Sequence, residues 1–184
     1  MNKIQRVSFY FRLIFQCFFC IIPLTLILFW VFLPANNLGV DQWFGMVNYI
    51  PEGIQNKIIN PLPGSTKLLG FLISLIPVTV SEIILFLLIR LFRHYEKNEI
   101  FNLKSVNYIK KIGRTLLVGC MLAPIHEVLL SAALTWHNPV GQRVAVISMS
   151  SSSVVIILTS LMIILISWIM SEACQLKDEQ QLTI

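Results

Sequence analysis

Three ionisable residues interrupt apolar runs of the sequence, and these are the groups that could do chemistry inside a membrane. Glu82 stands within Leu68–Ile89, while His126 and Glu127 stand together within Thr115–Trp136. An ionisable group at the centre of a bilayer costs at least about 2.5 kcal/mol, so it usually faces other protein groups or a polar cavity. Along ideal helices, the two carboxyl groups lie roughly 11–12 Å and 18–20 Å from the basic residues that end the runs. Antiparallel packing of the two runs would therefore bring these groups within reach of one another.

Small and hydroxyl-bearing residues accompany these groups. Gly119, Ala123, Glu127 and Ser131 share one helical row, and small residues in such a row let a neighbouring helix approach closely. The predicted intramembrane polar site consists of Glu82, His126, Glu127, Ser81, Ser131, Ser152 and Ser160. Two interpretations stay open. Hydrogen bonding that fixes a helix bundle is favoured over a proton or cation pathway, because a pathway normally needs a longer relay.

Enzyme motifs are incomplete in this sequence. The segment HEVLL, which begins at His126, lacks the second histidine of a metalloprotease helix, and neither a glycine-rich phosphate loop nor G-x-S-x-G occurs. Cys17 and Cys20 form C-x-x-C, but inside an apolar run, where cysteine usually behaves as a small hydrophobic residue. We predict no catalytic residue, metal or cofactor, and rank a membrane thiol-redox protein third among the functional hypotheses.

Four long apolar runs set the fold class. Of the 184 residues, 56% are hydrophobic and 12% charged, and about 25% charged residues would be usual for a soluble domain. A helix needs roughly 20 apolar residues to cross a bilayer. The sequence predicts an all-α integral membrane four-helix bundle, a single domain over residues 1–184. Its predicted parts are spans 13–33, 68–89, 115–136 and 144–170, an extracytoplasmic loop 34–67 and a basic cytoplasmic loop 90–114.

The distribution of positive charge predicts the orientation. Lys and Arg are retained on the cytoplasmic side of a membrane. Eleven of the 14 Lys and Arg residues fall in the N-terminal segment, the 90–114 loop or the C-terminal tail. We therefore expect both termini in the cytoplasm of a bacterial inner membrane protein. The net charge of +5 indicates contact with anionic lipids and not with nucleic acid.

The basic loop contains a predicted amphipathic helix. Asn102 is a suitable N-cap for it, and apolar residues recur at helical spacing from Leu103 to Ile112. Its basic face consists of Lys104, Lys110, Lys111 and Arg114. Helices of this kind lie at the membrane interface on anionic lipid, which is the favoured interpretation, and a protein-binding face is the alternative.

The same loop resembles the signature segment of a family of four-span bacterial membrane proteins known as domain of unknown function 2975. The matching residues are Tyr95, Ile100, Phe101, Val106, Ile112 and Gly113. Asn98 replaces a usual glycine, and Ser105 a usual asparagine. The resemblance implies a bacterial inner membrane protein of unestablished activity, often encoded beside a small helix-turn-helix regulator. It carries no catalytic residues over to this chain.

These observations predict a non-catalytic regulatory or accessory membrane protein. It would bind a cytoplasmic or membrane protein partner through the basic loop or the C-terminal tail, and a homo-oligomer is compatible with the sequence. The alternative is a small proton- or cation-coupled transporter or channel subunit that uses Glu82, Glu127 and His126.

Overall fold

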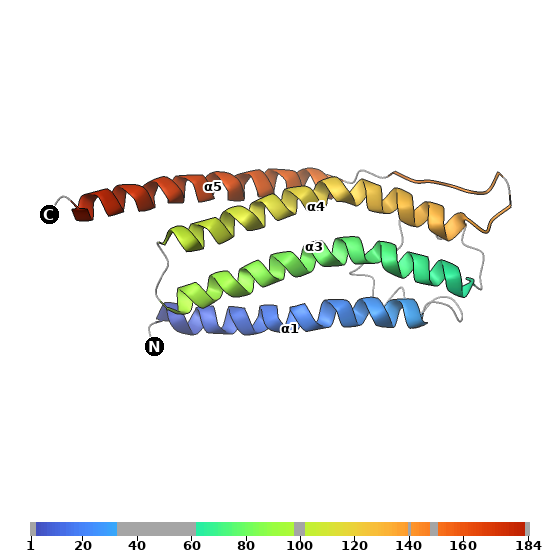
Figure 1. The fold of residues 1–184 in the computed structure, drawn as a ribbon, viewed down its shortest axis with the longest axis horizontal. Helices are drawn as coiled ribbons and strands as arrows, with labels where there is room; N and C mark the ends of the chain where they lie inside the picture. The colour runs from blue at the N-terminus through green and yellow to red at the C-terminus, as the bar shows by residue number, and fades with distance from the viewer. Residues whose placement is uncertain (1–2, 33–61, 98–101, 140, 148–150, 183–184) are drawn as a thin grey trace. The chain divides into compact units, whose positions relative to one another are not determined.

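The computed structural model describes residues 3–32, 62–97, 102–139, 141–147 and 151–182. Within these residues the chain is helical apart from short connections, and Figure 1 labels the four long helices. They are α1 (Lys3–Phe32), α3 (Gly64–Glu96), α4 (Leu103–Thr135) and α5 (Ser151–Leu182). Each is long and apolar enough to cross a membrane. The predicted all-α, multi-pass membrane fold is confirmed. The predicted loop 34–67 lies mostly outside the described residues.

The predicted amphipathic helix is the first part of α4. Asn102 caps it as expected, because its Oδ1 accepts a hydrogen bond from the Lys104 N–H at 3.1 Å. Val106 and Ile112, on the apolar side, are buried. The basic segment and the third membrane-crossing segment are therefore one continuous helix that begins at Leu103.

The helix after the last connection begins later than its apolar run. The predicted fourth span starts at Val144, whereas α5 starts at Ser151. The Val144 N–H donates to Thr135 Oγ1 at 3.2 Å, and the Val146 N–H donates to Ser131 Oγ at 3.0 Å. Because backbone groups outside a helix must find other partners in an apolar environment, these two hydroxyls of α4 allow the segment to stay non-helical.

The helices contribute to two compact units. The unit that contains both chain ends, the terminal unit, comprises Met1–Cys20, Val80–Cys120 and Ser151–Ile184. The other, the distal unit, comprises Ile21–Thr79 and Met121–Ser150.

Within the terminal unit, aromatic rings and one ion pair join α1 to α3. Phe92 of α3 lies against both Phe11 and Phe15 of α1, with ring centroids 5.4 Å apart in each case. Beside them, Arg12 Nε donates to Glu96 Oε1 at 2.7 Å. These contacts place the beginning of α1 along the last turns of α3.

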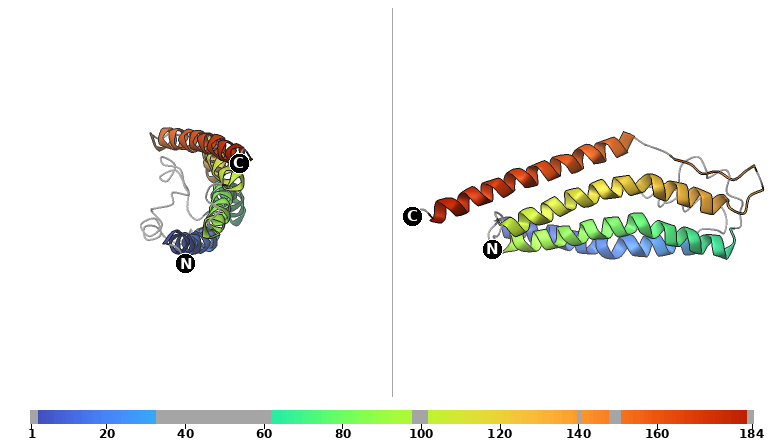
Figure 2. Two further views of the ribbon diagram at one scale, coloured as in Figure 1. Left: turned by 90° about the vertical axis from the view of Figure 1, so that its left-hand side faces the viewer. Right: turned by 45° about the horizontal axis from the view of Figure 1, so that its top comes forward.

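An aliphatic cluster joins α3 to α4 in the same unit. Leu87, Leu91 and Ile112 are buried together. In the terminal unit these two helices lie side by side both in Figure 1 and in the views of Figure 2. Further along, a side chain at Gly119 would meet Val80 of α3, since a Cβ there would come within 2.6 Å of Val80 Cγ1.

The helices α4 and α5 approach each other through small residues. A Cβ on Gly113 would lie 2.8 Å from Ile164 Cγ1 and 3.1 Å from the Ser160 carbonyl oxygen, so only glycine fits without movement of α5. On α5, small buried residues recur every seven positions. Ser160 and Ser167 are fully buried, and Cys174 is 4% exposed. Close approach of two helices through glycine and serine is characteristic of membrane proteins.

The distal unit has its own apolar core. Its buried members are Leu26, Phe29, Trp30, Leu62, Val78, Leu130 and Leu134. The Trp30 ring occupies the space beside Gly70, where a Cβ would come within 1.9 Å of Trp30 Cη2. The glycine therefore makes room for the largest side chain of this core.

The α4–α5 contact can be tested by filling the space at Gly113. We expect Gly113→Leu to lower the free energy of unfolding by about 1–3 kcal/mol, the usual cost of overpacking a well-packed interface. The measurement is unfolding of the purified protein in detergent by titration with sodium dodecyl sulfate. Gly64→Leu is the matched control, because no described residue lies within 4 Å of a Cβ at that position. Equal stability of the two variants would contradict the close packing.

Candidate functional site

The carboxyl group of Glu82 stands out in the terminal unit. It lies on α3, inside the segment able to cross a membrane. Both carboxyl oxygens are buried, and neither has a hydrogen-bond partner among the residues that the structure describes. Burial of two carboxyl oxygens without hydrogen bonds is energetically unfavourable in an apolar environment. Chemically, this carboxyl group is suited to take up a proton or a cation.

The other two ionisable groups of the predicted polar site belong to the distal unit. His126 and Glu127 follow each other on α4 and are both half-buried. The Nε2 atom of His126 is buried and has no hydrogen-bond partner within the described parts of the chain. Glu82 belongs to the terminal unit, so its predicted contact with His126 and Glu127 stays a prediction.

The described serines of the predicted site form hydrogen bonds mainly with backbone groups. Ser131 Oγ donates to the Val128 carbonyl at 3.0 Å and accepts from the Val146 N–H at 3.0 Å. Ser160 Oγ donates to the Ile157 carbonyl of its own helix at 2.7 Å. These bonds support the interpretation that the serines fix the helices. Ser81 is half-buried beside Glu82, and the Ser152 side chain lies outside the described residues.

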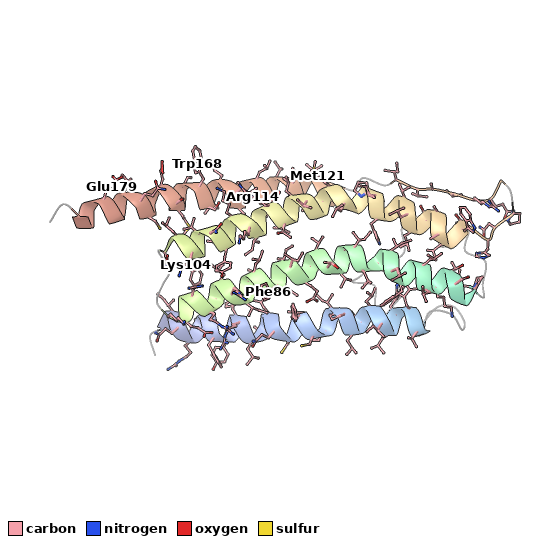
Figure 3. All side chains as sticks on the ribbon, viewed as in Figure 1. Phe86, Lys104, Arg114, Met121, Trp168 and Glu179 are labelled. Carbon is pink, nitrogen blue, oxygen red and sulfur yellow. The ribbon has the colours of Figure 1, made fainter. Side chains whose placement is uncertain are left out.

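The predicted basic face is present on α4. Lys104, Lys111 and Arg114 are exposed, and Lys110 is half-buried. Figure 3 labels Lys104 near the start of this helix and Arg114 further along it. None of the four forms an ion pair with another residue in the described ranges. Such unpaired, exposed cations are available to an anionic partner.

Along the same exposed face of α4, the basic residues give way to apolar ones. Val118 is 51% exposed and Met121 is 70% exposed, one and two turns beyond Arg114. Large apolar side chains left uncovered on a helix able to cross a membrane are the surface that lipid covers. The change between Arg114 and Val118 therefore marks where the environment of α4 becomes apolar.

The four cysteines are free thiols on three different helices. Cys17 and Cys20 are exposed on α1, and Cys174 is buried on α5. Cys120 Sγ donates to the Ser153 carbonyl at 3.6 Å, which adds a contact between α4 and α5. Among the described residues, no three His, Cys, Asp or Glu side chains are grouped so that they could hold a metal ion. The thiol-redox hypothesis stays a prediction that rests on the Cys17–Cys20 spacing alone.

The sequence reasoning missed a polar contact in the distal unit. Thr66, which is 1% exposed, lies with its Oγ1 3.1 Å from His137 Nδ1. Nearby on the chain, Arg143 Nε donates to the Asn138 carbonyl at 3.1 Å, and its guanidinium lies 5.5 Å from the Trp136 ring centre. No local pattern indicates a pair 71 residues apart, whereas the seven-residue spacing of Ser153, Ser160, Ser167 and Cys174 was visible in the sequence.

Comparison with known families supports the resemblance found in the basic segment. Residues 53–184 match the family model described as protein of unknown function, DUF2975. Comparison with curated proteins and with solved structures finds no match. The matched region includes α3, α4 and α5, and therefore the Glu82 carboxyl group, the basic face and the α4–α5 contact. The chain thus belongs to the DUF2975 family of proteins of unknown function.

Proposed function

We propose that this protein is a non-catalytic accessory or regulatory component of the bacterial inner membrane, with both termini in the cytoplasm. The charge distribution supports the orientation. Exposed basic residues are frequent in the terminal unit, and the described part of the distal unit contains Lys67 and Arg143 as its Lys and Arg residues. By the positive-inside rule, the terminal unit faces the cytoplasm.

The observation that carries the proposal is the extra length of α5 in the terminal unit. From the contact between Gly113 and Ile164, α5 continues in one direction to its last residue, Leu182. In the same direction, α4 extends only to its first residue, Leu103. At 1.5 Å per residue, α5 extends roughly 12 Å past the start of α4. We refer to residues 172–182 as the α5 stalk; its extension past α4 is visible in Figure 1.

One side of the α5 stalk presents the groups expected of a docking surface. Cys174 is buried near its base, and Leu176, on the opposite side of the helix, is 59% exposed. Glu172 and Glu179 are exposed on that same side, one turn before and one turn after Leu176. An apolar residue between two acids fits a basic protein surface with an apolar pocket, since such helices bind through spaced anchors and charge complementarity. The partner is therefore a cytoplasmic protein with a basic docking surface.

Photo-cross-linking in cells tests this docking surface. A photoreactive amino acid at Leu176 should give a cross-linked product of defined mass, whereas the same group at Leu161, exposed on the apolar part of α5, should not. We expect Glu172→Lys with Glu179→Lys to reduce the product at least fivefold by reversing the complementary charge. Equal products at positions 161 and 176, or a product unaffected by charge reversal, would overturn the proposal.

Charge reversal on α4 separates the two predicted partner surfaces. If Lys104→Glu, Lys110→Glu and Lys111→Glu abolish the product while the reversals on the α5 stalk leave it unchanged, the partner binds the basic face instead. Under the proposal, the triple reversal reduces the product less than twofold, provided that membrane insertion is unchanged.

A second candidate function follows from the unpartnered oxygens of Glu82. A membrane-embedded carboxyl group with both oxygens unused is typical of proton- or cation-coupled transport. In proteoliposomes with an internal pH-sensitive dye, we expect Glu82→Gln to reduce proton flux at least tenfold. Glu172→Gln should leave the flux unchanged, because that acid is exposed and lies near the end of the apolar span of α5. Absence of flux in the unaltered protein would exclude this candidate.

A further inference from the structure

The terminal unit contains exposed basic side chains on both α3 and α4. They are Arg90 and Arg93 on α3 and Lys104, Lys111 and Arg114 on α4, which together we name the cationic band. Among the described residues, none of these five forms an ion pair. Glu96, the acid at the same end of α3, is already bonded to Arg12. The cationic band is therefore open to anions from outside the described residues.

On one side, the cationic band is flanked by apolar surface at the same depth. The contact of Gly113 with Ser160 and Ile164 places Arg114 level with that turn of α5. Further toward the chain end, α5 still exposes large apolar groups, with Trp168 65% and Ile169 59% exposed. At 1.5 Å per residue, this apolar surface continues roughly 6–12 Å past the level of Arg114. Lipid that covers α5 therefore reaches the depth of the band.

Apolar surface also flanks the cationic band on the side of α1. Phe11 and Phe15 lie against Phe92, the residue before Arg93. In the sequence between Phe11 and Phe15, Leu13 is 47% exposed and Ile14 is 45% exposed. At the depth of Arg93, α1 thus presents a surface suited to acyl chains. The cationic band thus lies at a depth where both α1 and α5 still expose large apolar side chains, and the Arg12 charge on α1 is already paired with Glu96.

The Arg90 side chain lies toward the apolar part of its helix. Its guanidinium carbon is 4.8 Å from the centre of the Phe86 ring, which is 45% exposed and labelled in Figure 3. Leu87, next to Phe86, shares a buried cluster with Ile112, two residues before Arg114. The guanidinium of Arg90 therefore lies near the level at which Arg114 leaves the backbone of the neighbouring helix α4.

We propose that the cationic band is a binding site for the phosphate headgroup of an anionic phospholipid. Hydrocarbon offers no counter-ion, so cations at this depth are stabilised by phosphate groups drawn inward from the headgroup layer. A guanidinium presents a planar fork of donors that matches phosphate oxygens. The apolar surfaces of α1 and α5 accept the acyl chains, which a free phosphate lacks. The site is separate from the α5 stalk and does not depend on the proposed function.

Native mass spectrometry of the purified full-length protein tests this site. In detergent with equal amounts of phosphatidylglycerol and phosphatidylcholine, we expect retained phosphatidylglycerol to exceed retained phosphatidylcholine at least fivefold. Arg90→Gln with Arg114→Gln should remove this preference. The matched control is Lys67→Gln with Arg143→Gln, which removes the same charge from the distal unit and should leave the preference intact.

Two further experiments distinguish a lipid phosphate from a soluble one and control for misfolding of the double variant. Inorganic phosphate at millimolar concentration should not displace the lipid; displacement would assign the site to a soluble anion and overturn the proposal. Single Arg114→Gln, at an exposed position, should reduce the preference at least twofold even if the double variant is unstable. Equal preference in the unaltered protein and in folded Arg114→Gln protein would also overturn it. Detection of a dimer without bound lipid would overturn the proposal as well, because a second copy of the chain would then cover the cationic band.

Discussion

The contact between Gly113 and the Ser160–Ile164 turn sets the relative depth of α4 and α5, and much of the terminal unit depends on it. With no Cβ at position 113, the two helices come so close that the Ser160 carbonyl oxygen lies 3.1 Å from the position a Cβ would take. Hydrocarbon gives apolar helices no reason to prefer one another over lipid, so close packing of small residues must hold them together. The register of this contact determines both how far α5 reaches beyond α4 and which residues lie beside Arg114.

Many hydroxyl groups of the described chain donate to backbone carbonyls, although Ser74 Oγ is buried with no partner among the described residues. Ser160, Ser167 and Thr159 all donate to carbonyls of their own helix. Ser131 and Thr135 also hold the backbone that precedes α5. A serine in a membrane helix is therefore weak evidence for a transport pathway when its donor is already engaged. The carboxyl oxygens of Glu82 are a stronger indication, because they are buried and no described residue forms a hydrogen bond with them.

The fold was predictable from sequence because its main determinant, the length of each apolar run, is local. The Asn102 cap was likewise visible in a few neighbouring residues, and the family resemblance lay in the segment from Tyr95 to Gly113 that surrounds it. Contacts between distant residues were not predictable in this way. Nothing near Arg12 indicates that it pairs with Glu96, 84 residues away, and hydropathy alone extended the fourth span back to Val144. For the polar site, the residue types were recognisable, but the engagement of Ser131 with Val146 depends on the path of a connection that has no sequence motif.

The non-helical segment before α5 has a consequence for how the length of that helix is determined. Val144–Ile147 is apolar enough to extend a membrane helix, so its backbone has two competing sets of partners, its own next turn or the hydroxyls of Ser131 and Thr135. Gly141, with a φ of 98°, reverses the chain so that the second set is within reach. Hydrophobicity alone therefore does not determine whether this segment is helical, because the two hydroxyls offer its backbone other partners. Relatives that lack either hydroxyl would be free to begin this helix one or two turns earlier.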